Sequence, residues 1–475
     1  MHAWVAAAFA FAFASVFAGC GSHSQQPDLD AATHGPDAAH DAVPADADLN
    51  AATDVPAVPC TDTPAAVYAA TPHAGAPLGT ILACAPDPKL DVGALPGMVG
   101  SGVMVTSAVA QFRIAYQTRD GAGMPAVSTA RVYLPSTPRA RPVPIVVAAH
   151  GSVGLADGCT PSTDVDASLP LPYAARGFAA IAPDLAGLGN AGTQDYLDNH
   201  AQGWQVLDGA RSLRALMAPG IAAQDLIVTG YSQGGGAALS AHSLIHADGP
   251  GAGHLVATVV YAPEWPIRLA SFGYIGILRD PTQLTIFTGL SNSSVAVMRQ
   301  YAFLEDHVAT GHGKDSAPSQ FRAGLETSIQ SQCLVALGGW IQTQMLHTGD
   351  LIDPTLRTGL LACVDALGPG AGCTGDAAAY YDFLMHNHLA ADPTAGPVLI
   401  VQGLLDQIMP PANEAACVKD KLAGAGVDVD TCVISDASHT TIMDHHAEGV
   451  AWAESVLAGG IRTECDQANQ LPACN

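Results

Sequence analysis

The pentapeptide at residues 230–234, GYSQG, places a serine between two glycines where a predicted strand ends. The apolar residues 226–228 close that strand, and the small residues 235–239 open a predicted helix. A strand, a sharp turn and a helix form the setting of a nucleophile elbow, which exposes a serine hydroxyl for attack. Gly230 and Gly234 fit such an elbow because side chains would clash where the two backbones pass close together. A tight turn with an incidental hydroxyl is the alternative, whereas the glycine-rich phosphate-binding patterns do not fit.

A serine hydroxyl is a poor nucleophile until a base takes its proton, so a histidine and an orienting carboxylate are required. Asp406 follows the predicted strand 398–402, and His439 follows the predicted strand 429–434. The C-terminal ends of strands are where the sites of α/β proteins assemble. We therefore predict a catalytic triad of Ser232, Asp406 and His439. The fallback candidates for the acid and the base are Asp436, Asp444, His445 and His446.

The negative charge that develops on an attacked carbonyl oxygen needs N–H donors already in place, each worth about 10²- to 10³-fold in rate. The predicted strand 144–149 leads into a His-Gly-Ser loop, which resembles the HG loop that supplies one such donor in lipases. By that resemblance the N–H groups of Ser152 and Gln233 form the oxyanion hole, and His150 braces the loop. A simple turn after the strand is the alternative.

Together these segments resemble the α/β-hydrolase superfamily and, within it, the secretory lipases related to lipase A. The resemblance rests on the serine elbow, the loops that carry Asp406 and His439, and a large insertion before the acid strand. It covers roughly residues 65–457. It implies an α/β-hydrolase fold, with a mostly parallel sheet, helices on both faces and a mostly helical cap. It also implies hydrolysis of lipids or other carboxylic esters under that cap, with no cofactor.

Segments with the two-residue hydrophobic period of strands alternate with segments that have the helical period along the folded part of the chain. Apolar alternation at residues 103–109, 111–117 and 130–134 predicts an opening set of antiparallel strands. Short apolar runs rich in β-branched residues then predict buried strands at residues 144–149, 179–183, 226–229, 255–261, 398–402 and 429–434. Helical patterns lie at residues 171–176, 204–217, 236–246, 413–423 and 446–457. Buried strands separated by helices indicate a mostly parallel sheet that is covered on both faces.

The chain divides into five predicted segments. Residues 1–19 are apolar but short, which is typical of a signal peptide. Residues 20–59 are rich in Ala, Asp and Pro and predict a disordered tether. Residues 60–264 and 396–475 form the hydrolase core. The intervening residues 265–395 are far longer than an ordinary crossover and predict the helical cap.

Several features predict export. Residues 17–20, FAGC, resemble the lipobox of bacterial lipoproteins, in which Cys20 would become the lipidated N-terminus and anchor the protein to a membrane. An ordinary cleaved signal is the alternative. Apart from Cys20, ten cysteines can pair in an oxidising compartment. Their spacing suggests the pairs Cys60–Cys84, Cys363–Cys373, Cys417–Cys432 and Cys465–Cys474, which leaves Cys159 for Cys333. We predict a secreted, periplasmic or surface-anchored protein.

The charge balance restricts the partners. The chain has 43 acidic and 18 basic side chains and a formal net charge of −25. Such a chain repels nucleic acid and anionic membrane surfaces, while a neutral ester substrate remains possible. Two histidine pairs, His242 with His246 and His386 with His388, lack a third ligand at suitable spacing, so we predict no metal site.

The prediction for function is a serine hydrolase, a lipase or esterase, that cleaves carboxylic esters through an acyl-enzyme. A peptidase of the same fold is one alternative. It would need an acidic site for the peptide's amino end in the cap, where Glu305 and Asp306 are the candidates. A surface lipoprotein that binds without turnover is the other alternative, and the presence of all three catalytic residue types argues against it. No oligomeric state is predicted.

Overall fold

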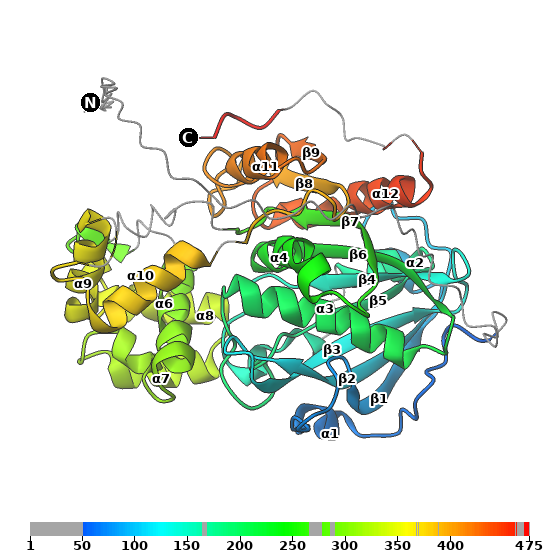
Figure 1. The fold of residues 1–475 in the computed structure, drawn as a ribbon, viewed down its shortest axis with the longest axis horizontal. Helices are drawn as coiled ribbons and strands as arrows, with labels where there is room; N and C mark the ends of the chain where they lie inside the picture. The colour runs from blue at the N-terminus through cyan, green and yellow to red at the C-terminus, as the bar shows by residue number, and fades with distance from the viewer. Residues whose placement is uncertain are drawn as a thin grey trace, which may run out of the picture. The chain divides into compact units, whose positions relative to one another are not determined.

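A single sheet organises the core of the computed structural model, which describes residues 51–163, 169–265, 278–285, 290–366, 368, 370–387, 389–460, 462 and 470–474. The sheet has nine strands in the order β1-β2-β3-β5-β4-β6-β7-β8-β9 (Figure 1). The strands are β1 Ile81–Leu90, β2 Val109–Arg119, β3 Pro125–Pro135, β4 Val143–Ala149, β5 Ala179–Pro183, β6 Ala222–Tyr231, β7 His254–Tyr261, β8 Val398–Gly403 and β9 Val429–Ile434.

The pairing of neighbouring strands changes once along the sheet, from antiparallel to parallel. Strands β1, β2 and β3 pair in antiparallel fashion, and β3 is also antiparallel to β5. From β5 to β9 every neighbouring pair is parallel. The C-terminal ends of these strands therefore meet at one edge of the sheet, which is where a site is expected to assemble. The prediction of a mostly parallel sheet with an antiparallel start is confirmed.

Helices cover both faces of the sheet because successive strand residues point to opposite sides. Val147 belongs to the apolar cluster that includes side chains of α3, α4 and α11, whereas its neighbour Val146 belongs to the cluster that includes side chains of α2 and α12. Figure 1 shows helices on both faces of the sheet. The helices are α2 Pro170–Ala175, α3 Asn199–Leu216, α4 Gln233–Asp248, α11 Ala415–Gly424 and α12 His446–Leu457. The central strands β4 and β8 are buried along their whole length, as their continuous apolar sequences predict, whereas the edge strands β1 and β9 are partly exposed.

A group of helices lies between β7 and β8 in the chain, in the predicted cap segment. These helices are α6 Leu290–Phe303, α7 Arg322–Ser331, α8 Leu334–Gln344, α9 Pro354–Ala366 and α10 Gly375–His386. Their apolar side chains form two clusters of their own, one around Met298 and one around Tyr380. This group, drawn in yellow-green to yellow, stands beside the sheet in Figure 1, and we refer to it as the cap.

The start of the sheet differs from the prediction. A strand at residues 103–109 is wrong, because only Val109 of that segment belongs to a strand, and the N–H groups of Thr106 and Ser107 donate to Ala175 O at the end of α2. The actual first strand, β1, contains Pro86 and Pro88. These prolines break the apolar alternation, yet they are tolerated because β1 is an edge strand.

The last residues of the predicted tether pack against the core. The Thr53 hydroxyl donates to Pro135 O at 2.5 Å, and the Ala57 N–H donates to Leu216 O at 2.7 Å. Ordered packing thus begins before residue 60. The predicted signal peptide, Cys20 and the tether up to residue 50 lie outside the described residues. In the described ranges, no helix has the length and hydropathy needed to cross a bilayer.

Disulfide pairing agrees with the prediction in three places and differs in one. Cys60–Cys84, Cys159–Cys333 and Cys363–Cys373 are bonded as predicted. Cys417 is bonded to Cys474, so the predicted pairs Cys417–Cys432 and Cys465–Cys474 are wrong. Closeness in sequence is a poor guide here, because Cys417 pairs with a cysteine 57 residues away. Cys465 lies outside the described residues.

Candidate active site

The turn between β6 and α4 holds Ser232 in a strained backbone conformation. Its φ is 53° and its ψ is −118°, backbone angles that residues other than glycine rarely adopt. A Cβ on Gly230 would collide with the carbonyl of Gly234, and a Cβ on Gly234 would collide with the carbonyl of Ala149. The glycines therefore permit the close approach that the sharp turn requires, as the elbow prediction expects.

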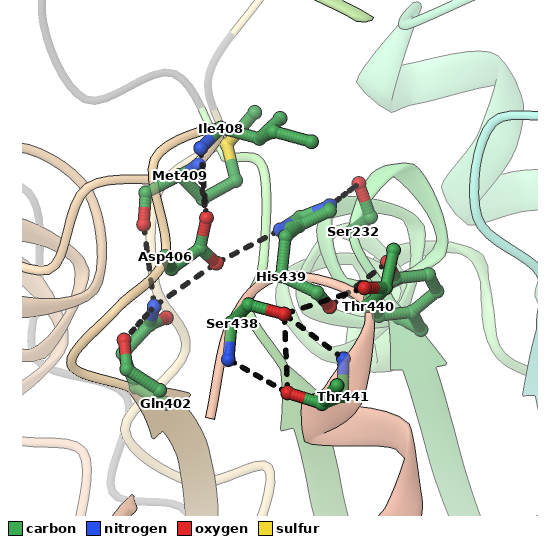
Figure 2. Close-up of polar contacts among 11 residues, drawn as sticks. Ser232, Gln402, Asp406, Ile408, Met409, Ser438, His439, Thr440 and Thr441 are labelled. Carbon is green, nitrogen blue, oxygen red and sulfur yellow. Dashed lines mark hydrogen bonds and ion pairs between the residues drawn. The ribbon is translucent and has the colours of Figure 1, made fainter. Parts of the chain in front are cut away.

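The three predicted triad residues lie within hydrogen-bonding distance at the C-terminal edge of the sheet (Figure 2). His439 Nε2 lies 3.0 Å from Ser232 Oγ, and His439 Nδ1 lies 2.8 Å from Asp406 Oδ2. An ionised carboxylate can only accept a hydrogen bond, so Nδ1 carries the proton and Nε2 is left to accept from the serine hydroxyl. The order of donors runs from serine to histidine to aspartate, which is the arrangement that a proton relay needs.

Asp406 is held by its own loop. The N–H groups of Ile408 and Met409 donate to Oδ1 at 2.9 and 2.8 Å. Gln402, the penultimate residue of β8, donates from Nε2 to Oδ2 at 3.2 Å and also to Met409 O (Figure 2). These hydrogen bonds fix the orientation of the carboxylate beside the imidazole.

Tyr231 positions the histidine loop from the residue before the nucleophile. Its hydroxyl donates to His439 O at 3.0 Å, and its ring lies 5.1 Å from the imidazole, centroid to centroid. The same ring also packs against Gly151, where a Cβ would clash with it. One side chain therefore sets the spacing between the nucleophile, the histidine loop and the loop after β4.

The two predicted oxyanion donors come from different segments: Ser152 lies in the loop after β4, and Gln233 begins α4 directly after Ser232. The N–H groups of Ser152 and Gln233 donate to no acceptor in the described parts of the chain. The Ser152 hydroxyl lies 2.6 Å from the hydroxyl of Tyr196. His150 links the loop after β4 to the end of β5: its Nδ1 lies 2.7 Å from Gly151 O, and its Nε2 lies 3.0 Å from Asp184 O.

The cap is attached to this same loop. The Leu334 N–H, at the start of α8, donates to Val153 O at 2.7 Å. The preceding residue, Cys333, is bonded to Cys159, 174 residues earlier in the chain. A hydrogen bond and a covalent bond therefore join α8 to the segment that carries Ser152.

A cavity of about 320 Å³ adjoins the site. Its lining includes Ser152, Tyr231 and Thr440, and Thr440 is the residue after His439. Leu169, Pro170, Val153 and Met443 supply apolar wall. The cavity can take an uncharged, mostly apolar group next to Ser152 and to the residues that flank the serine and the histidine, Tyr231 and Thr440.

The other candidates from the sequence do not join the triad. Asp436 and Asp444 are exposed, His445 contacts Glu448, and the ring of His446 packs near Tyr261. Glu305 and Asp306 line a second cavity, of about 360 Å³, whose lining includes none of the triad residues.

Of the two histidine pairs, His242 and His246 each contact another group, and His388 of the second pair lies outside the described residues. His242 contacts Gly396 O and His246 contacts Asp392. Across the part of the chain that the structure describes, no three His, Cys, Asp or Glu side chains are grouped so that they could hold a metal ion.

No protein-family model matches this sequence, and no curated protein matches it. Solved structures do match. Candida antarctica lipase A in its closed state is 16% identical with a TM-score of 0.61, over 88% of this chain and 91% of that one. The chain has an α/β-hydrolase fold of the lipase type.

A bacterial protein shares the same α/β-hydrolase fold. The rice cell wall degrading esterase LipA from Xanthomonas oryzae is 18% identical with a TM-score of 0.57, over 80% of this chain and 97% of that one. Identities this low establish the fold of the hydrolase and leave its chemistry to be argued from the site itself.

Sequence patterns did not identify every polar residue beside the α/β-hydrolase triad. Tyr196, Gln402 and Glu264 were not singled out for a role. Gln402 offered a weak signal, because it is a polar residue inside a buried apolar strand, where a polar side chain needs a partner. Tyr196 and Glu264 offered none, since the contact of Tyr196 with Ser152 and that of the Glu264 N–H with Ser232 O depend on how distant loops pack.

Proposed function

We propose that this protein is an exported serine hydrolase, a lipase or esterase, that cleaves carboxylic esters through an acyl-enzyme. The observation that carries the proposal is the hydrogen-bonded relay from Ser232 through His439 to Asp406. Four disulfides among the described residues support export, because structural disulfides persist in oxidising compartments. In this proposal Cys20, at the end of the signal peptide, is the lipid attachment site.

The reaction would begin with attack of Ser232 Oγ on the ester carbonyl carbon while His439 Nε2 takes the hydroxyl proton. The N–H groups of Ser152 and Gln233 would stabilise the oxyanion of the tetrahedral intermediate. His439 then gives its proton to the departing alkoxide, which leaves an acyl-serine. Asp406 keeps the imidazole in the required tautomer and stabilises its cationic form throughout.

Deacylation repeats the same steps with water. His439 takes a proton from the water, whose oxygen attacks the acyl carbon, and then returns a proton to Ser232 Oγ as the carboxylic acid leaves. The mostly apolar cavity beside Ser152 suits an alkyl part of the ester. No residue of this scheme requires a cofactor.

A fluorophosphonate probe tests the nucleophile, because it reacts with activated serines. We expect one labelled serine in the wild type and none in Ser232→Ala, with ester hydrolysis reduced on the order of 10⁶-fold. A folded wild-type protein that the probe does not label would favour a binding protein without turnover.

The choice between ester and peptide substrates needs a second assay. Rates on p-nitrophenyl esters from acetate to palmitate would be compared with the rate on an aminoacyl anilide. We expect the esters to be preferred. A preference for the anilide would identify a peptidase of the same fold.

A further inference from the structure

Glu264 is a carboxylate beside the nucleophile that the relay does not use. It follows β7, and its N–H donates to Ser232 O at 3.0 Å. Its Oε2 is shielded from solvent and has no hydrogen-bond partner among the described residues. The side-chain amide of Gln233, the residue after the nucleophile, is 1% exposed and equally without a partner there. Unsatisfied polar groups of this kind cost about 1–3 kcal/mol each, so the fold alone does not explain them.

The negative charge of Glu264 affects ionisable groups near the loop after β4 and near the loop after β8. Burial raises the pKa of Tyr196, and the negative charge of Glu264 adds to the rise. Tyr196 in turn contacts Ser152 in the loop after β4. Burial, followed by the charge of Glu264, raises the pKa of Glu414 to about 8, and the charge of Asp406 contributes as well. The charge of Glu264 therefore acts on groups that are linked to both the loop after β4 and the loop after β8.

The cap completes this environment with a cation. Burial raises the pKa of Glu264, and the charge of Arg299 in α6 opposes that rise. Arg299 is 7% exposed, and its charge also opposes the rise in the pKa of Glu414. The unpaired Oε2 of Glu264 can still accept a hydrogen bond from a further donor. A hydroxyl or ammonium group placed there would satisfy Oε2 and reduce the repulsion between Glu264 and Glu414.

We propose that Glu264 is a specificity-determining residue that accepts a hydrogen bond from a hydroxyl or ammonium group of the ester bound at Ser232. This inference rests on the proposed ester hydrolysis and narrows its substrate class. The favoured substrates are short esters with a donor group near the scissile bond, and plain alkyl esters are poorer. A site that holds a hydrogen-bonding partner discriminates strongly against an analogue that lacks it, because the buried polar group is then left unpaired.

Isosteric esters test this preference directly. For the acyl side, methyl 3-hydroxybutyrate and methyl 3-aminobutyrate would be compared with methyl 3-methylbutyrate by titration of the released acid. For the alcohol side, 2-hydroxypropyl butyrate would be compared with 2-methylpropyl butyrate. We expect kcat/KM to be about 10-fold or more higher for the donor-bearing ester on one of the two sides. That side identifies which part of the substrate contacts Glu264.

Two substitutions separate charge from hydrogen bonding. Glu264→Gln keeps an acceptor oxygen but loses the charge, so it is expected to lose the preference for ammonium and to keep part of that for hydroxyl. Glu264→Leu removes both and is expected to reverse the ratio in favour of the alkyl ester. Glu326→Gln removes a partly buried carboxylate from α7 in the cap and is the matched control, which should leave the ratio unchanged.

A wild-type enzyme that prefers the alkyl isostere on both sides would overturn the inference, and so would a Glu264→Leu variant that keeps the wild-type ratio. The kcat/KM ratio of the wild type tests the inference even where the variants fail to fold. If the inference is overturned but butyrate esters are still hydrolysed in a Ser232-dependent way, the proposed function stands. Failure to hydrolyse any ester, together with no fluorophosphonate labelling, would overturn both proposals.

Discussion

Two buried aspartates follow strands of the same sheet and have opposite surroundings. Asp406 comes after β8 and is 4% exposed, while Asp195 comes after β5 and is 5% exposed. Asp406 is surrounded by donors: both oxygens accept N–H groups, from its own loop and from Gln402 and His439. Asp195 receives one long hydrogen bond from a side chain, that of Gln205 at 3.4 Å. Burial is equal, so the difference lies in the neighbours.

Asp195 lies in an acidic cavity of about 360 Å³ near the turn between β2 and β3. Asp120, Glu305, Asp306 and His307 share the lining of this cavity. Burial, followed by the charge of Asp198, raises the pKa of Asp195 to about 7, although the Gly121 N–H and His307 act in the opposite direction.

The comparison teaches that a buried carboxylate is useful as an anion only where the backbone supplies donors. At Asp406 the acid loop supplies them, and the charge is available to the histidine. At Asp195 neighbouring carboxylates oppose ionisation, so the proton is retained over much of the acidic and neutral range. A position at the C-terminal edge of a sheet is not sufficient for a catalytic acid.

The largest expected difference comes from the same substitution at both positions. Asp406→Asn should lower kcat by about 10⁴-fold, because the amide no longer holds the imidazole in the reactive tautomer. Asp195→Asn should leave kcat within about twofold, since that side chain does not contact the relay. Steady-state ester hydrolysis measures both. Comparable losses of activity in the two variants would contradict the distinction.

The free energy of unfolding should change in the Asp195→Asn variant, although its kcat should not. The raised pKa of Asp195 means that its contribution is favourable below the unfolded-state value of 3.8 and is lost as pH rises toward about 7. Asp195→Asn should therefore be close to neutral near pH 3.5 and stabilising by up to about 4 kcal/mol above pH 7. Denaturant unfolding across this pH range measures the difference from wild type. A gain that does not grow with pH would show that Asp195 is not held protonated.

A smaller effect is expected from the glutamines that contact the two aspartates. Gln402→Leu removes the donor to Asp406 and should lower kcat about 10-fold with little change in KM, since one hydrogen bond is worth about 1.4 kcal/mol. Gln205→Leu removes the donor to Asp195 and should lower stability while kcat stays unchanged. Kinetics combined with thermal unfolding separates these roles. A loss confined to stability in Gln402→Leu would mean that Gln402 only supports the fold.

Local patterns in the sequence predicted much of the core. The strand at β9 and the helix at α12 have the predicted bounds, because a buried strand and an amphipathic helix each have a period that their own residues impose. The edge strand β1 was missed because its prolines obscure that period. The pairing of Cys417 was mistaken because nearness along the chain does not measure distance in space.

The sequence by itself determined the elbow at Ser232 and the order of serine, acid and histidine along the chain, since turns and strand ends depend on neighbouring residues. Only the tertiary structure decided that His439 lies between Ser232 and Asp406, and that Asp406 collects donors while Asp195 faces other carboxylates. It alone revealed Glu264 beside the nucleophile. The physical reason is that charge and hydrogen bonding act through space, and the packing of distant loops sets which groups come within their range.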